Sequence, residues 1–339
     1  MRIRRWNIRE LKVNRFRFLI GLVCGIVLLE VSQFKKLIIN SNWVIDVPAL
    51  EKVVYDMQSN VSSNVKPMNN FDEAYIYKIN PADSMCDNSN CDSLQMILIV
   101  KSYVFNFGQR EAIRRTWGST PKLRSKTVFI VGYADGLDKF VKHESTHNND
   151  IIQLDMPDQY ENEVYKTIYS ILWLSRVNLK PEFVFFVNDD RLVNPMNIYY
   201  VATNNMYSTD SLMLGYRLSF SRASRDNSAR HYISPEDYPF VFFPPYIIGG
   251  NILTNIKTIK ILAIAVAFIK VIPVEEAYIG IVAKSANIKL KHYSGFLPFK
   301  ESLSVLRKAV SSPGYEATYL LIRDWGLLHE DNARDSNKL

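Results

Sequence analysis

The chain has 339 residues, of which 47% are hydrophobic and 22% are charged, a composition that supports a folded core and excludes a largely disordered chain. The net charge of +7 arises in large part before the first apolar run, where basic residues cluster. Because the charge is so uneven, and because the chain has no zinc-finger spacing and no RNA-binding aromatic motif, we expect no nucleic-acid partner.

The first apolar run covers residues 18–29 (FLIGLVCGIVLL) and ends before Glu30. Basic residues precede it and no small-residue cleavage site follows it, which favours a signal anchor whose N-terminus stays in the cytoplasm. We therefore expect a cytoplasmic tail over 1–17, a transmembrane segment over 18–35 and a lumenal remainder. A run this short is also compatible with a cleaved signal peptide or a buried helix.

Residues 36–90 lack regular patterning and contain many Asn, Ser, Asp and Pro residues, which is typical of a stem that spaces a domain from a membrane. Asn60 begins an N-glycosylation sequon, which is used only in a lumenal segment. Cys86 and Cys91 lie close together. They can form a local disulfide in an oxidising lumen, remain free thiols or pair with another chain.

The folded domain is expected over 91–339. Short apolar runs predict strands at 96–100, 127–132 and 183–187, and an apolar face at helical spacing predicts a helix over 163–177. Strands that alternate with helices indicate an α/β domain with a mostly parallel central sheet, in which ligands bind at the carboxyl ends of the strands.

The third strand ends in a cluster of polar residues, Asn188, Asp189 and Asp190. Adjacent carboxylates repel one another unless a cation is present, and Mg²⁺ or Mn²⁺ often binds through one or two carboxylates together with substrate phosphates. The pattern therefore fits a seat for a metal and a diphosphate. A solvated turn is the alternative, since Asn and Asp are common in turns.

Two later segments have functional and structural interpretations. Residues 235–251 contain aromatic residues, prolines and the pair Gly249 and Gly250, which permits close backbone approach to a ligand or forms a hydrophobic loop over the core. Glu275 and Glu276 precede a predicted helix. Acidic residues there favour the helix dipole, but a carboxylate that faces a cleft can also deprotonate a sugar hydroxyl.

Taken together, these segments resemble the β-1,3-galactosyltransferase family, which includes β-1,3-N-acetylglucosaminyltransferases. The resemblance extends over roughly residues 94 to 295 and rests on motifs in the family's order. They are 110–118 (REAIRRTWG), 158–167 (DQYENEVYKT), 188–194 (NDDRLVN), 236–239 (EDYP), 244–250 (PPYIIGG) and 275–280 (EEAYIG).

The resemblance implies a GT-A fold and an inverting mechanism with a UDP-sugar donor and Mn²⁺. By correspondence, Asp190 is the metal ligand and Glu276 stands where the family has its catalytic Asp. The residues implied at the nucleotide sugar are Arg110, Arg114, Asn188, Asp189, Gly249 and Gly250.

The expected activity is transfer of galactose or N-acetylhexosamine to a hydroxyl of a glycan, on a glycoprotein or glycolipid, in β-1,3 linkage. The expected setting is the Golgi membrane, with type II topology. Several departures from the family motifs, among them Asn188 for a carboxylate, Glu276 for an Asp and His231 for a Trp, leave an alternative open. This is a pseudo-glycosyltransferase that acts as a lumenal binding or chaperone-like protein.

Overall fold

The computed structural model describes residues 50–61, 64–71, 76–82, 84–85, 94–205 and 211–336. These residues belong to one compact unit, Asp46–Leu339. The expected tail and anchor, and the two cysteines of the stem, lie outside the described residues. In the described part of the chain, no helix is both long enough and apolar enough to cross a membrane.

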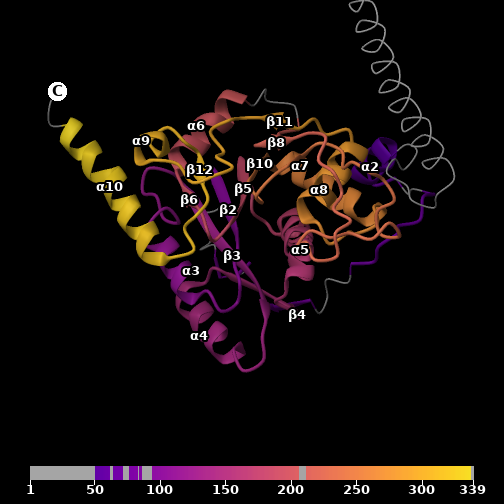
Figure 1. Cartoon of the computed structure of the whole chain (residues 1–339). Coiled ribbons are helices and arrows are strands. Elements are labelled where there is room, and N and C mark those ends of the chain that lie inside the picture. The colour runs from indigo at the N-terminus through magenta and orange to yellow at the C-terminus, as the bar shows by residue number, and fades with distance from the viewer. Residues whose placement is uncertain are drawn as a thin grey trace, which may run out of the picture. The chain divides into compact units, whose positions relative to one another are not determined.

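An eight-stranded sheet forms the centre of the fold, in the order β1-β4-β3-β2-β5-β10-β7-β11 (Figure 1). The strands β4, β3, β2 and β5 are parallel, whereas β10 runs antiparallel between β5 and β7, and β1 is antiparallel to β4 at one edge. The structure thus confirms the mostly parallel α/β sheet. The strands are β1 Tyr77–Ile79, β2 Met96–Lys101, β3 Ser125–Tyr133, β4 Ile151–Pro157, β5 Phe183–Asn188, β7 Met213–Gly215, β10 Ile252–Asn255 and β11 Lys291–His292.

Two further pairs of short strands lie outside this sheet. One pairs β6 with β12, and the other pairs β8 with β9. Their bounds are β6 Leu192–Val193, β8 Arg217–Leu218, β9 Tyr246–Ile247 and β12 Ser311–Ser312.

The central strands β2 and β5 are apolar along almost their whole length because both faces of the sheet are covered. They pair in parallel, and the register places Lys101 opposite Asn188 at their carboxyl ends. The change from apolar to polar residues therefore occurs at the same level in two neighbouring strands. This shared end forms one side of the site described below.

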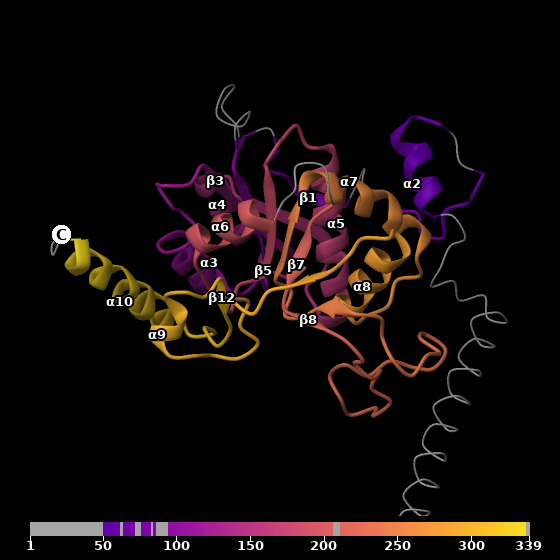
Figure 2. The ribbon, with the colours of Figure 1, turned by 90° about the horizontal axis from the view of Figure 1, so that it is seen from above.

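Helices cover both faces of the sheet (Figure 2). On one face α5 packs against α7 and α8, and on the other α10 packs against α3. The predicted helix over 163–177 is confirmed as α5. The helices are α2 Leu50–Gln58, α3 Phe107–Arg114, α4 Asp138–Asn148, α5 Glu163–Arg176, α6 Pro195–Asn205, α7 Ile256–Ala265, α8 Glu275–Ser285, α9 Leu303–Leu306 and α10 Thr318–Ser336, with 3₁₀ turns at η1 Tyr160–Asn162 and η2 Val266–Phe268.

The expected stem differs from the structure in its described part. Helix α2 packs against α7, and β1 adds an edge strand to the central sheet. The side chain of Asn69 donates to the carbonyls of Val266 and Ile269 at 2.8 and 2.6 Å. The folded unit therefore begins before residue 91, because several short contacts far apart in the sequence hold this segment on the domain.

Candidate active site

A cavity of about 700 Å³ opens at the carboxyl ends of β2 and β5. Its lining combines the ends of these strands with the start of α8, the turn before α5 and a loop that contains Arg230 and His231. Open α/β sheets bind ligands at this edge. Among the residues singled out from the sequence, the cavity is lined by Asn188, Asp189, Asp190, Glu275 and Glu276.

A buried ion pair lies at the base of this cavity. Lys101, the last residue of β2, donates to both carboxylate oxygens of Glu275, and Thr167 donates its hydroxyl to the same carboxylate. Burial raises the pKa of Glu275, and the charge of Lys101 opposes this effect. All of these polar atoms have partners, so the pair can position neighbouring groups but is poorly placed to exchange a proton with a ligand.

The neighbouring acids Asp189 and Asp190 have different surroundings. Asp189 is buried and accepts from Ser102 Oγ at 2.6 Å and from Asn106 Nδ2 at 3.0 Å, so its carboxylate orders the loop after β2. In the described part of the chain, the buried Oδ1 atoms of Asp190 and Asn188 have no hydrogen-bond partner. Burial raises the pKa of Asp189 and that of Asp190. Asp190 and Asn188 thus present two oxygen atoms that a ligand can satisfy.

Glu276 differs from its neighbour Glu275. It is half-buried, lines the cavity and forms no hydrogen bond or ion pair with the described residues. Tyr160 lines the same cavity; burial raises its pKa, and the negative charge of Glu276 adds to this rise. The Tyr160 hydroxyl contacts Nδ1 of His231, and the guanidinium of Arg230 lies 4.6 Å from the centre of the Tyr160 ring. The unpaired carboxylate of Glu276 therefore shares the cavity with the polar side chains of Tyr160, Arg230 and His231.

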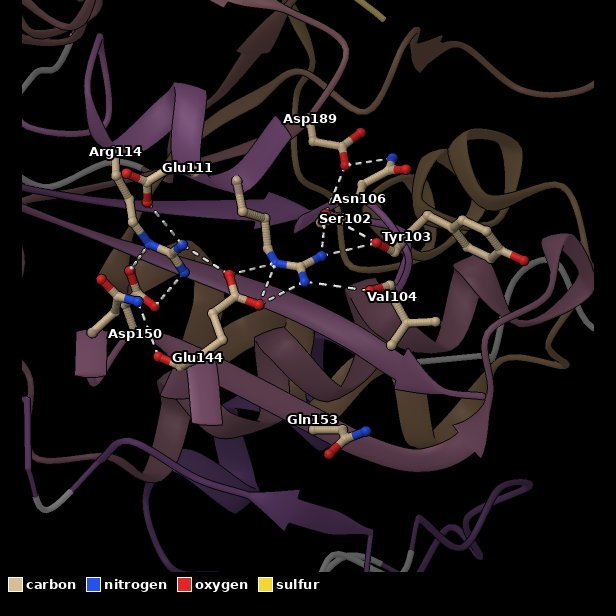
Figure 3. A network of polar contacts seen from close by, with 12 residues as sticks. Ser102, Tyr103, Val104, Asn106, Glu111, Arg114, Glu144, Asp150, Gln153 and Asp189 are labelled. Atoms are coloured by element: carbon tan, nitrogen blue, oxygen red, sulfur yellow. Dashed lines mark hydrogen bonds and ion pairs between the residues drawn. The ribbon is translucent and has the colours of Figure 1, made fainter. Parts of the chain in front are cut away.

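Arg110 and Arg114 do not line the cavity. Arg110 is fully buried and donates to Glu144 at 2.9 and 2.7 Å, and Arg114 donates to Asp150 at 2.7 and 2.9 Å and to Glu144 at 2.8 Å. Figure 3 shows the part of this network around Arg114, Glu144 and Asp150. The network reaches the site where Arg110 donates to the Ser102 hydroxyl at 3.2 Å. The structure gives these arginines protein acceptors, and they support the loop that holds Asp189, while their contact with a nucleotide stays a prediction.

Gly249 and Gly250 both have positive φ, +69° and +62°. A Cβ atom on Gly249 would lie 2.2 Å from Nη2 of Arg191, and one on Gly250 would lie 2.6 Å from Oδ1 of Asn188 and 2.8 Å from Nζ of Lys101. The glycines are absent from the described lining of the cavity. The two glycines instead lie close to the side chains of Arg191, Asn188 and Lys101, and a larger residue at either position would displace these side chains.

The described residues contain no group of three or more His, Cys, Asp or Glu side chains that could hold a metal ion. Because residue 188 is an asparagine, the motif at 188–190 has only two acids, and one of them, Asp189, already accepts hydrogen bonds from Ser102 and Asn106. The unpaired oxygens of Asp190 and Asn188 are nevertheless the hard donors that Mg²⁺ and Mn²⁺ accept. A divalent cation that also binds substrate phosphates fits them better than one held by the protein alone.

Lys101, which lines the cavity, and Arg191, which follows Asp190, were not predicted from the sequence as functional residues. Lys101 had a signal, because it is the single charged residue of an otherwise apolar strand. Arg191 had none, since an arginine after two aspartates is also typical of an exposed turn. Their importance depends on Glu275 and Gly249, which lie far away in the sequence.

The fold and the site define an α/β protein with a polar cavity at the carboxyl edge of its sheet, where an unpaired carboxylate and buried oxygen donors face a ligand. The chain belongs to the galactosyltransferase family, whose model, described as Galactosyltransferase, matches residues 108–294. This region contains every residue assigned above to the lining of the cavity except those of the β2 end and the loop after it.

Curated relatives agree with this family. Beta-1,3-galactosyltransferase brn of Drosophila melanogaster is 31% identical over 206 residues, which cover 60% of this chain and 63% of the relative. Beta-1,3-galactosyltransferase bre-5 of Caenorhabditis elegans is 28% identical over 209 residues, 60% of this chain and 64% of the relative. A mouse protein, UDP-GlcNAc:betaGal beta-1,3-N-acetylglucosaminyltransferase 7, is 24% identical over 257 residues, 70% of this chain and 64% of the relative. The chain thus spans slightly less than two thirds of the length of these relatives.

Proposed function

We propose that this protein is a hexosyltransferase that moves galactose or an N-acetylhexosamine from a UDP-sugar to a glycan hydroxyl in β-1,3 linkage, with inversion at the anomeric carbon. The observation that supports this most directly is the pair of unsatisfied acids in one cavity. Asp190 offers a buried oxygen without a partner in the described part of the chain, and Glu276 offers a carboxylate without one. Membership of the family and the names of the relatives support the same reaction class.

The donor side of the site consists of the ends of β2 and β5. Asp190 and Asn188 are the residues that would hold Mn²⁺, and the metal, when bound, would stabilise the departing diphosphate. Asp189 keeps the loop after β2 in place through Ser102 and Asn106. These contacts lie within the protein, and groups that the protein itself holds in place bind a ligand at a lower entropic cost.

The acceptor side is the part of the cavity around Glu276 and Tyr160. Glu276 would take the proton from the acceptor hydroxyl. As it does so, the hydroxyl oxygen bonds to the anomeric carbon and the bond from that carbon to UDP breaks. Glu275 cannot take this role without breaking its ion pair with Lys101. The two consecutive glutamates thus have separate tasks, one to hold the helix in place and one to accept the proton.

Sugar transfer by the full chain in detergent, with Mn²⁺, several UDP-sugars and an array of glycan acceptors, tests this proposal. Replacement of Glu276 by Gln should lower kcat by about 10²–10⁴-fold with little change in donor affinity. Glu301→Gln is a matched control, because Glu301 is an exposed acid that does not line the cavity. A folded protein that binds UDP but transfers no sugar to any acceptor would instead support the pseudo-glycosyltransferase alternative.

The cellular setting is part of the proposal. The apolar run within 18–35 and the basic residues before it support a single-pass type II protein of the Golgi membrane, with the cavity in the lumen. Acceptors in that compartment are glycans of glycoproteins and glycolipids. The N-terminal charge serves the membrane orientation in this view, and no nucleic acid is involved.

A further inference from the structure

Arg191 is a buried cation directly after the acids of the site. Only 6% of the residue is exposed, although arginine is rarely buried without a partner. The indole Nε1 of Trp117 donates to the backbone carbonyl of Arg191 at 3.0 Å, and this bond fixes the position of the main chain between β5 and β6. The position of the side chain is therefore set by the fold and is not that of a solvated turn.

The guanidinium of Arg191 has five N–H donors, and the described residues satisfy few of them. Nη1 donates to the carbonyl of Leu297 at 3.4 Å, which is a long contact. Nε is buried and has no partner in the described part of the chain, and none of the ion pairs formed by the described side chains includes Arg191. A buried charge in this state is costly unless a ligand supplies the missing acceptors.

The surroundings of Arg191 point to the donor side of the cavity. Its Nη2 atom lies so close to Gly249 that a Cβ atom there would be 2.2 Å away. Arg191 is not itself among the described residues that line the cavity, but it directly follows Asp190, which does. Gly249 precedes Gly250, which approaches Oδ1 of the lining residue Asn188. A ligand that reaches the unpaired oxygen of Asp190 therefore comes within range of a positive charge that has hydrogen bonds to offer.

We propose that Arg191 binds the diphosphate of the nucleotide sugar and supplies part of the positive charge that the metal would otherwise provide. A guanidinium suits this task because its planar N–H groups bind phosphate oxygens in pairs. The proposal also explains why the site tolerates Asn188, since a motif with one acid fewer attracts a cation less strongly. It rests on the proposed use of a UDP-sugar, and it gives UDP binding a component that is independent of metal.

Calorimetric titration of the full chain in detergent with UDP, once with Mn²⁺ and once with EDTA, separates the two components. The wild type should bind UDP in EDTA, and uridine, which lacks the phosphates, should bind far more weakly. Arg191→Gln removes the charge, so UDP affinity in EDTA should fall by about 10- to 100-fold, with a smaller loss in Mn²⁺. Arg191→Lys restores the charge and should recover part of the affinity in EDTA.

Arg191→Leu provides a second test, because its apolar side chain can be neither charged nor hydrogen-bonded and its effect on stability can be measured without a ligand. Replacement of a buried, unpaired charge by an apolar residue should leave the thermal unfolding midpoint unchanged or raise it. Folded Gln and Leu variants that bind UDP in EDTA as tightly as the wild type would overturn the role of Arg191, as would a Lys variant no better than Gln. UDP binding by the wild type only with Mn²⁺ would overturn the metal-independent component but leave the proposed function intact. No UDP binding under either condition would reject the donor itself.

Discussion

At the residue scale, Glu275 and Glu276 show how one helical step separates two identical side chains. Successive residues of an α-helix point about 100° apart, since the helix has about 3.6 residues per turn. Glu275 turns inward to Lys101 and Thr167, and Glu276 turns toward the cavity. The sequence predicted two acids at a helix start, but it could not assign their roles, because Lys101 lies 174 residues away from Glu275.

Exchange of each glutamate for Gln should therefore affect different properties. Glu275→Gln leaves the buried Lys101 without its counter-charge, and we expect the free energy of unfolding to fall by about 3–5 kcal/mol. Glu276→Gln should change it by less than about 1 kcal/mol, because Glu276 has no partner to lose. Chemical denaturation of both variants measures the difference. Equal loss of stability in the two variants would contradict the separate roles.

Asp190 and Asn188 allow a paired prediction on metal binding. Asp190→Ala removes the acid that offers an unpaired oxygen, so Mn²⁺ should no longer strengthen UDP binding. Asn188→Asp restores a carboxylate beside it and should tighten Mn²⁺ binding. Calorimetry with Mn²⁺ and UDP reports both effects. Weaker Mn²⁺ binding in Asn188→Asp would mean that Asn188 serves another partner, and Lys101, which also lies against Gly250, is a candidate.

At the scale of elements, a charge network joins α3 to α4 and to the start of β4. Glu144 on α4 pairs with Arg110 and Arg114 of α3, and Arg114 also pairs with Asp150, the residue before β4 (Figure 3). The motif that contains these arginines was recognised from the sequence, but its contact with a nucleotide was inferred by correspondence alone. The structure gives the arginines acceptors on α4, a helix for which no motif was recognised.

Glu144→Gln tests whether this network is structural. It leaves the fully buried guanidinium of Arg110 without its carboxylate, so the free energy of unfolding should fall by about 3–5 kcal/mol. The control is Asp56→Asn, which breaks the surface pair with Lys52 on α2, outside this network, and should cost about 0–1 kcal/mol. Because Arg110 supports Ser102, UDP affinity should fall with stability in Glu144→Gln. A stable variant with weakened UDP binding would instead favour direct nucleotide contact by the arginines.

At the scale of the whole molecule, the sequence predicted the parallel centre of the sheet well because continuous apolar runs such as those of β2 and β5 have few alternatives. It failed at the N-terminal edge. Strand β1 has only three residues, and its pairing with β4 depends on contacts with residues more than 70 positions away. Short elements of this kind lack a periodic signal, so the segment around them was predicted to be a stem.

A truncated chain tests where the folded unit begins. A protein that starts at Leu94 lacks α2, β1 and the bonds from Asn69 to η2 and the residue after it, and it exposes the edge of β4. We expect it to be less stable than one that starts at Asp46, and more prone to aggregate, because an open sheet edge can pair with other chains. Thermal unfolding and size-exclusion chromatography compare the two. Equal stability would restore the view of this segment as a spacer.

The proposed membrane topology gives the last prediction, because Asn60 reports on the compartment that contains the fold. It lies in an exposed turn after α2, with φ of +58°, so its side chain is accessible on the surface of the folded unit. If the anchor places this unit in the lumen, endoglycosidase should lower the apparent mass of the cell-expressed protein. Asn60→Gln should remove that shift, and so should Ser62→Ala, which destroys the sequon but keeps the asparagine at its positive φ. A shift that persists in both variants would place the glycan elsewhere. An unglycosylated protein in the cytosol would contradict the topology and remove the acceptors on which the proposed reaction depends.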